Sequence, residues 1–334
     1  MLYPPDPALA ADAARRRITL SAGDPELLRR MLTVVNGAAG SRGPRLRLEL
    51  EVESGLGRGG FEPAAIAAAA KAVAAQPRAR FAGLWTHLQA ADDGPRTVAQ
   101  YARFEVALAA LANAGLSAPR RHVVASGGLA VGGLAAYDAL RPGLAVYGIV
   151  PEDVDTTSGP SLAGLRPVLA LKARPSRVSD LPAGWGVSYG PTFVTRRPSR
   201  IATLPLGYAD GYPRNLSNRA DALVRGVRVP LVGNVTMDAL MVDVSGVTGR
   251  PVDVDDEFVL IGRQGGAEIP VLELAQRAGT ITWVIVAGMA RRLPRVYDAP
   301  PGAVGVRTLS SPRTTWQASS SGTATSATWR STPS

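Results

Sequence analysis

Three short motifs in the second half of the chain place aromatic or methionine side chains where turns are expected. They are Ser188-Tyr189-Gly190, Gly207-Tyr208-Ala209-Asp210-Gly211-Tyr212 and Val235-Thr236-Met237-Asp238. Each lies at the end of an apolar, β-branched run in a polar context of glycine and proline. Taken alone, a tyrosine before glycine is best interpreted as an aromatic residue of a β-turn, and a single methionine as a core residue.

Groups able to bind anions or to move protons occur in the first half of the chain. Arg58 follows a glycine-rich turn, and its planar guanidinium can bind a carboxylate through two hydrogen bonds. His87 closes the run Gly83-Leu84-Trp85-Thr86, at the end of a predicted strand where barrel enzymes carry catalytic groups. An isolated histidine is more often structural. We interpret His122 as structural, since it starts a predicted strand at the opposite end.

Two further segments follow the last predicted strands of the first half. Ala125-Ser126-Gly127-Gly128 and Arg141-Pro142-Gly143-Leu144 combine a hydroxyl group with backbone N–H groups next to glycine. These are the donors that a phosphate dianion requires, and barrel enzymes commonly bind phosphate in the loops after strands 7 and 8. Two ordinary turns between a strand and a helix would have the same sequence.

The glycine-rich residues 55–60 formally match a dinucleotide-binding fingerprint. That fingerprint requires an acidic residue about 20 positions further on. Residues 71–85 contain neither Asp nor Glu, so the sequence argues against a dinucleotide site.

The composition is that of an ordinary globular protein, with 46% hydrophobic and 19% charged residues among 334. The net charge of +10 comes mostly from arginine, since Lys71 and Lys172 are the two lysines. The basic residues form no run typical of nucleic-acid binding. The lack of cysteine excludes disulfides and thiolate metal sites, and we expect no metal. No long apolar stretch and no signal peptide is present, which predicts a cytoplasmic protein without membrane contact.

Strand and helix patterns alternate over residues 17–150. We expect strands at 18–21, 46–53, 81–87, 122–126 and 140–148, and helices at 63–75 and 96–113. In the second helix Tyr101, Phe104, Leu108 and Leu111 recur on one apolar face. Such alternation predicts an α/β fold with a parallel sheet or a (β/α) barrel.

The pattern changes after about residue 165, where short strands follow one another. We expect strands at 201–206, 229–232, 237–244 and 257–261, and a helix at 271–278. The chain is therefore divided into an α/β domain at 1–150, a linker at 151–166, a mainly β domain at 167–309 and a disordered Ser/Thr-rich tail at 310–334.

Taken together, these motifs resemble those of alanine racemases that use pyridoxal 5′-phosphate (PLP), over about residues 1–308. The resemblance implies a partial (β/α)8 TIM-type barrel followed by a C-terminal mainly β domain. It implies interconversion of L- and D-alanine for peptidoglycan synthesis by a cytoplasmic homodimer. In this family the second domain of one subunit covers the barrel of the other, so each active site is shared. Partners other than alanine and a second subunit, such as nucleic acid or a membrane, are not implied.

The resemblance also implies a PLP site in the first half of the chain. Ser126, Gly143 and Leu144 resemble the residues that bind the phosphate. Arg141 resembles the arginine that faces the pyridine nitrogen, where a cation keeps that nitrogen unprotonated and disfavours transamination. His87 resembles the histidine between this arginine and a catalytic tyrosine, so His87 and Arg141 are expected to be both cofactor-binding and catalytic.

Substrate binding is implied at further positions. Tyr189 resembles the base on the L-alanine side. Arg58 resembles the arginine that holds the substrate carboxylate, Met237 the residue whose N–H meets that carboxylate, and Tyr208 a residue of the substrate entrance. Glu51 stands where the family often has a carbamylated lysine, and it could give Arg58 a negative partner without modification.

One part of the family pattern has no counterpart in the sequence. A Lys-Ala-x-Ala-Tyr-Gly-type motif carries the lysine that forms the Schiff base with PLP and acts as the D-side base. Lys71 and Lys172 lie in other contexts. We therefore expect an N-terminally truncated member of the family that is inactive as this chain.

Two alternatives are a PLP-binding or interaction protein without catalysis and a racemase of broader amino-acid specificity. A PLP decarboxylase of the related barrel class is disfavoured, because that class usually relies on a catalytic cysteine.

Overall fold

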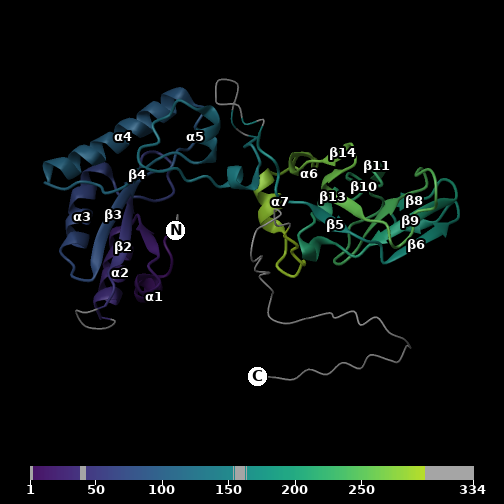
Figure 1. The fold of residues 1–334 in the computed structure, drawn as a ribbon, viewed down its shortest axis with the longest axis horizontal. Helices are drawn as coiled ribbons and strands as arrows, with labels where there is room; N and C mark the ends of the chain where they lie inside the picture. The colour runs from purple at the N-terminus through teal and green to yellow at the C-terminus, as the bar shows by residue number, and fades with distance from the viewer. Residues whose placement is uncertain (1–2, 38–42, 153, 155–161, 163, 298–334) are drawn as a thin grey trace, which may run out of the picture.

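A parallel sheet with the strand order β1-β2-β3-β4 organises the first half of the chain in the computed structural model (Figure 1). Its strands are β1 (Thr19–Ala22), β2 (Leu46–Glu51), β3 (Ala79–Trp85) and β4 (Arg121–His122). The structure describes residues 3–37, 43–152, 154, 162 and 164–297. The predicted tail at 310–334 and part of the predicted linker lie outside these residues.

Helices lie before, between and after the parallel strands. They are α1 (Ala10–Arg15), α2 (Pro25–Gly37), α3 (Ile66–Ala74), α4 (Gly94–Asn113) and α5 (Ser126–Val131), with short 3-10 helices η1 (Pro7–Leu9), η3 (Pro63–Ala65) and η4 (Leu144–Tyr147). Helix α4 begins after Asp93, whose side chain accepts the Arg96 N–H. Phe104 and Leu111 are buried on its inner face, as the apolar periodicity predicts.

Two predictions about the last strands of this domain are wrong. Strand β4 ends at His122 instead of reaching residue 126, and Ser126 begins α5. Residues 140–148 form no strand: Arg141 pairs with Ala125 in an isolated bridge, and a 3-10 helix follows. Pro142 has no N–H to donate, so the ladder cannot continue past Arg141.

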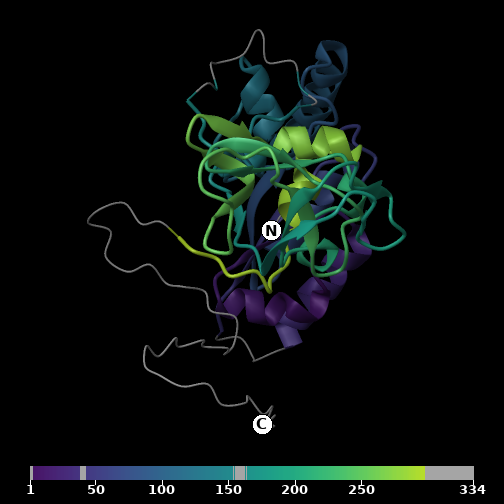
Figure 2. The same cartoon turned by 90° about the vertical axis from the view of Figure 1, so that its right-hand side faces the viewer.

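The second half of the chain is mainly antiparallel β-structure. Its strands are β5 (Leu171–Ala173), β6 (Arg177–Leu181), β7 (Gly186–Val187), β8 (Phe193–Val194), β9 (Ser199–Leu204), β10 (Asp221–Val224), β11 (Val227–Pro230), β12 (Leu240–Asp243), β13 (Phe258–Gln264) and β14 (Ala267–Ile269). They form sheets with the paths β11-β10-β13-β14, β12-β9-β6 and β7-β8, and β5 pairs with β13. Figure 2 views this domain from its own side, with its strands in front of the sheet β1–β4.

The predicted helix at 271–278 is confirmed as α6 (Val271–Ala278), and α7 (Thr282–Gly288) is a helix that the sequence did not predict. Short 3-10 helices η5 (Tyr208–Asp210) and η6 (Arg214–Leu216) also interrupt the strands. The predicted fold class, an α/β part followed by a mainly β part, is confirmed.

Each half has its own hydrophobic core. Leu144 and Ile149 pack into the core of the second half although they follow the parallel sheet in sequence. The segment turns back at Gly148, where φ is 71° and a Cβ atom would lie 1.8 Å from the Arg166 carbonyl oxygen. Only glycine permits this approach.

Candidate active site

Arg141 lies at the centre of the candidate site. The Ala125–Arg141 bridge holds its backbone just beyond β4. Its guanidinium donates to the carbonyl oxygens of Thr86 at 2.7 Å and Val123 at 2.9 Å. It also lies 4.9 Å from the centre of the Trp85 ring, a cation–π contact. The cation is thus fixed by groups at the ends of β3 and β4.

Both histidines of the chain contact this guanidinium. His122 Nδ1 lies 2.6 Å from Arg141 Nη1, and His87 Nδ1 lies 3.3 Å from Nη2. Since arginine can only donate, each Nδ1 is assigned as the acceptor and each ring proton to Nε2. His122 Nε2 then donates to Glu49 Oε2 at 3.1 Å. Glu49, His122, Arg141 and His87 therefore form one hydrogen-bonded chain.

Burial and neighbouring charge set the protonation of this chain. Burial, reinforced by the charges of Arg141 and Arg58, lowers the pKa of His87 to about 4. Burial lowers the pKa of Arg141 to about 10, so it remains a cation at neutral pH. Burial favours protonated Glu49, but the hydrogen bond from His122 and nearby positive charges outweigh it, and the pKa of Glu49 falls below its usual value. At neutral pH the chain holds a neutral His87, a cationic Arg141 and an anionic Glu49.

The position predicted for His122 is wrong. It is level with Trp85 at the C-terminal end of β3, and its ring stacks on Trp85 with a centroid distance of 6.2 Å. The error arose because the strand was expected to begin at this histidine, whereas β4 ends there. The sequence does carry a signal for the true strand end. Ser126 begins a helix four positions after His122, so a strand that ends at His122 leaves room for the turn between them.

Ser126, Gly143 and Leu144 come together as the sequence predicts for an anion site. Ser126 Oγ accepts the Gly143 N–H at 2.8 Å and the Ala145 N–H at 3.3 Å. Ser126 and Leu144 are buried, and each begins a helical segment. A hydroxyl beside several backbone N–H groups is a donor set that fits a phosphate.

Arg58 lies at the edge of the same domain. Its Nη2 is 3.5 Å from Oε1 of Glu51, whose side chain is buried at the end of β2. Burial raises the pKa of Glu51, and the charge of Arg58 opposes this shift. The turn before Arg58 is held by Glu53, which accepts the N–H groups of Gly55 at 2.6 Å and Gly57 at 3.0 Å. Glu51 is therefore a negative partner for Arg58, as expected.

Tyr189, Tyr208 and Met237 are exposed on the second domain, with 78%, 42% and 54% of their surface accessible. Their segments are joined to one another. Ser188 Oγ donates to the Asn234 carbonyl at 2.7 Å, and Asn234 Nδ2 donates to the Tyr189 carbonyl at 2.8 Å. The Tyr208 N–H donates to the Thr236 carbonyl at 3.0 Å. Hydrogen bonds thus join the segments that carry these three exposed side chains.

Tyr212, in contrast, is fully buried in the core of the second domain. Tyr212 is therefore a packing residue of this core.

The predicted site residues therefore form two groups. Among the described residues, no hydrogen bond, ion pair or ring contact joins Arg58, His87, Ser126 and Arg141 to Tyr189, Tyr208 and Met237. The sheet that carries the first group and the strands that carry the second are separate in Figure 1.

Neither lysine is near these groups. Lys71 is exposed on α3. Lys172 on β5 pairs with Glu257 at 2.9 Å on the second domain.

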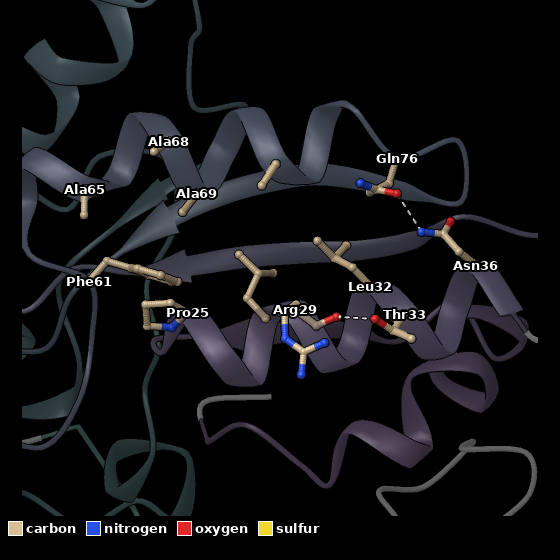
Figure 3. Close-up of a pocket in the computed structure, with 12 residues that line it drawn as sticks. Pro25, Arg29, Leu32, Thr33, Asn36, Phe61, Ala65, Ala68, Ala69 and Gln76 are labelled. Atoms are coloured by element: carbon tan, nitrogen blue, oxygen red, sulfur yellow. Dashed lines mark hydrogen bonds between the residues drawn. The ribbon is translucent and has the colours of Figure 1, made fainter.

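A sizeable cavity lies away from this chemistry. It is a groove of about 490 Å³ between α2 and α3, with Leu32, Phe61 and Ala69 in its wall and an Asn36–Gln76 hydrogen bond at one end (Figure 3). A smaller cavity of about 210 Å³ is lined by Glu49, Trp85, His122, Arg141 and their neighbours. The described part of the chain contains no helix long and apolar enough to cross a membrane and no cluster of metal-ligating side chains.

Comparison with known protein families gives two matches. Residues 1–151 match the alanine racemase N-terminal domain, and residues 168–297 match the alanine racemase C-terminal domain. An alanine racemase of Symbiobacterium thermophilum is 47% identical over 256 residues, which cover 75% of this chain and 66% of that protein. The chain thus spans just under two thirds of the length of this curated relative.

Solved structures of racemases are also similar. The crystal structure of alanine racemase from Bacillus anthracis with bound L-Ala-P has a TM-score of 0.80 and 29% identity, covering 91% of this chain and 77% of that one. A histidine racemase from Leuconostoc mesenteroides has a TM-score of 0.77 and 28% identity, covering 90% of this chain and 78% of that one.

Proposed function

The chain belongs to the alanine racemase family, and from this premise we propose that it serves the interconversion of L- and D-alanine with PLP. The observation that carries the proposal is the Arg141 guanidinium, fixed by two carbonyl oxygens and two imidazole nitrogens at one end of the sheet. We further propose that the D-alanine is used for peptidoglycan synthesis in the cytoplasm.

The donors present fit PLP. Ser126, with the N–H groups of Gly143 and Leu144, would hold its phosphate, the Gly143 N–H turning to it from Ser126 Oγ. Arg141 would face its pyridine nitrogen. PLP, when bound, supplies an electron sink that makes the α-proton of an amino acid more acidic. Because Arg141 stays charged, protonation of the pyridine nitrogen would be disfavoured, which limits side reactions.

Neutral His87 is suited to orient a tyrosine. Its Nδ1 accepts from Arg141, so its Nε2–H can donate to a phenolic oxygen. We propose Tyr189 as that tyrosine and as the proton acceptor on the L-alanine side. A donor on the phenolic oxygen stabilises the deprotonated form that a base requires.

The substrate carboxylate would be held from two sides. Arg58 offers a guanidinium whose direction is constrained by buried Glu51. Met237 offers a backbone N–H, and Tyr208 would line the entrance. A carboxylate that binds both cannot rotate freely, which fixes the Cα–H bond relative to the base.

We propose a homodimer in which Tyr189, Tyr208 and Met237 serve the partner subunit. The support is their exposure in one chain together with their separation from Arg58, His87 and Arg141. Large exposed aromatic and methionine side chains on hydrogen-bonded turns are typical of a protein–protein interface.

A lysine is the remaining requirement, and neither Lys71 nor Lys172 is placed to supply it. We expect the 334-residue chain alone to lack racemase activity and a longer form with a lysine at the site to have it. The lack of a placed lysine also favours a second candidate function, PLP binding without catalysis. The similarity to a histidine racemase supports a third, a racemase of broader specificity.

The test is a racemisation assay on both forms with L-alanine and L-histidine. The longer form should convert L-alanine faster, and Tyr189→Phe should lower kcat/KM by at least about a hundredfold, the size of a lost general base, while PLP absorbance remains. Arg263→Gln, at an exposed pair on the same domain, is the matched control. Near-normal turnover in Tyr189→Phe would refute the assigned base, and an inactive longer form that still binds PLP would favour the non-catalytic function.

A further inference from the structure

Arg292 joins the two segments of the second domain that carry proposed substrate-binding residues. Its Nε donates to Asp210 Oδ1 at 2.7 Å, and its Nη2 donates to Asp238 Oδ1 at 2.6 Å. Asp210 is the last residue of η5, which starts at Tyr208, and Asp238 directly follows Met237. One guanidinium thus holds both segments.

The same segments meet through their backbones. The N–H groups of Tyr208 and Ala209 donate to the carbonyl oxygens of Thr236 and Met237, each at 3.0 Å. Gly207 makes this approach possible, because a Cβ atom there would lie 2.2 Å from the Thr236 oxygen. Neither Gly207 nor residues 236–238 belong to a strand, so these few contacts set their relative position.

The two carboxylates differ in burial. Asp210 is 6% exposed, and its second oxygen accepts the Gly207 N–H at 3.0 Å. Burial favours its protonated form, but the hydrogen bonds from Arg292 and Gly207 outweigh burial and lower the pKa of Asp210. The pair with Asp210 is therefore part of the fold, since a buried anion without its cation is costly.

Asp238, in contrast, has a side chain that is 65% exposed. An exposed ion pair contributes little to the free energy of unfolding. The contact between Arg292 and Asp238 is thus more important for position than for stability. It restrains the residue next to Met237.

We propose that Arg292 is a positioning residue that, through Asp238, fixes the direction of the Met237 N–H. The proposal rests on the proposed function, in which this N–H meets the substrate carboxylate. Within the described part of the chain the Met237 N–H has no hydrogen-bond acceptor of its own. It is therefore free to bind a ligand, and its direction depends on the turn that Asp238 restrains.

Two variants distinguish an effect on the position of residues 236–238 from an effect on the stability of the domain. Asp238→Ala removes the exposed contact and leaves the Arg292–Asp210 pair intact. Arg292→Lys keeps a cation near Asp210, but one ammonium group cannot replace the fork that reaches both carboxylates. Arg263→Gln, at an exposed pair with Glu268, is again the control.

The first measurement is hydrogen–deuterium exchange on the 334-residue chain, which needs no activity. In both variants the amides of Tyr208, Ala209 and Ala239 should exchange about tenfold faster; the Ala239 N–H donates to Thr236 Oγ1 at 3.0 Å in the same turn. The Tm should change by only a few degrees in Asp238→Ala. The control should match the wild type. Unchanged exchange at these amides in Asp238→Ala would overturn the proposal. If Arg292→Lys does not fold, the result for Asp238→Ala alone tests the proposal.

The second measurement is steady-state kinetics of the longer, lysine-bearing form. Asp238→Ala should raise KM for L-alanine about fivefold to tenfold with kcat nearly unchanged, because binding and not proton transfer is affected. Faster exchange with an unchanged KM would refute the link to the substrate. A longer form without activity would count against the proposed function, whereas the exchange result would still report on the positioning of the segment.

Discussion

His87 gives a quantitative test of the charge arrangement in the site. The ring is half-buried beside Arg141, and its pKa in the folded protein is lowered to about 4. In the unfolded chain a histidine has a pKa of about 6.5. Between these values the unfolded chain binds a proton that the folded protein does not bind, so stability must fall as the pH falls through this range.

The magnitude follows from the two pKa values. Their difference corresponds to about 3 kcal/mol, and solvent screening of a half-buried ring reduces this to about 1–2 kcal/mol. This contribution is fully present above about pH 6.5 and is lost progressively as the pH falls to about 4. His87→Gln removes the titrating group but keeps a polar side chain. The difference in the free energy of unfolding, wild type minus variant, should therefore increase by about 1–2 kcal/mol from pH 4.5 to pH 7.5.

Two assays check this result. Urea unfolding at several pH values, followed by tryptophan fluorescence, gives the stability difference. Because the chain has two histidines, a proton NMR titration shows two imidazole signals, and the one lost in His87→Gln is assigned to His87. Arg141→Gln should return the pKa of His87 only part of the way towards 6.5, since burial is the larger cause. A measured pKa above about 6, or a stability difference that does not vary with pH, would refute this account of the site.

Two further predictions concern the core and the assembly. Tyr212→Phe should leave the free energy of unfolding unchanged or raise it by up to about 1 kcal/mol in urea denaturation, because the buried Tyr212 hydroxyl has no hydrogen-bond partner among the described residues. A loss of more than about 2 kcal/mol would contradict this, since it would mean that the hydroxyl makes a hydrogen bond. In the longer form, mixing inactive Tyr189→Phe with inactive Arg141→Ala should restore about a quarter of wild-type activity after random subunit exchange, since half of the dimers are mixed and each has one intact site. No recovery after verified exchange would exclude shared sites.

The family and the fold class could be predicted from the sequence alone, and the motifs were enough to name candidate site residues. Strand–helix alternation arises from local hydrophobic periodicity, which is why α4 and α6 were predicted closely. Motifs such as Ser188-Tyr189-Gly190 carry their information in residue types and spacing, which are local as well.

The tertiary structure decided what depends on contacts between distant residues. His122 joined the site only because β4 ends there and Arg141 returns beside it, a register that no local pattern encodes. Tyr212 and Tyr208 occupy the same motif, but packing buried one and exposed the other. The hydrogen bonds from Arg292 to Asp210 and Asp238 join residues more than fifty positions apart in the sequence. Only the folded chain brings these three side chains together.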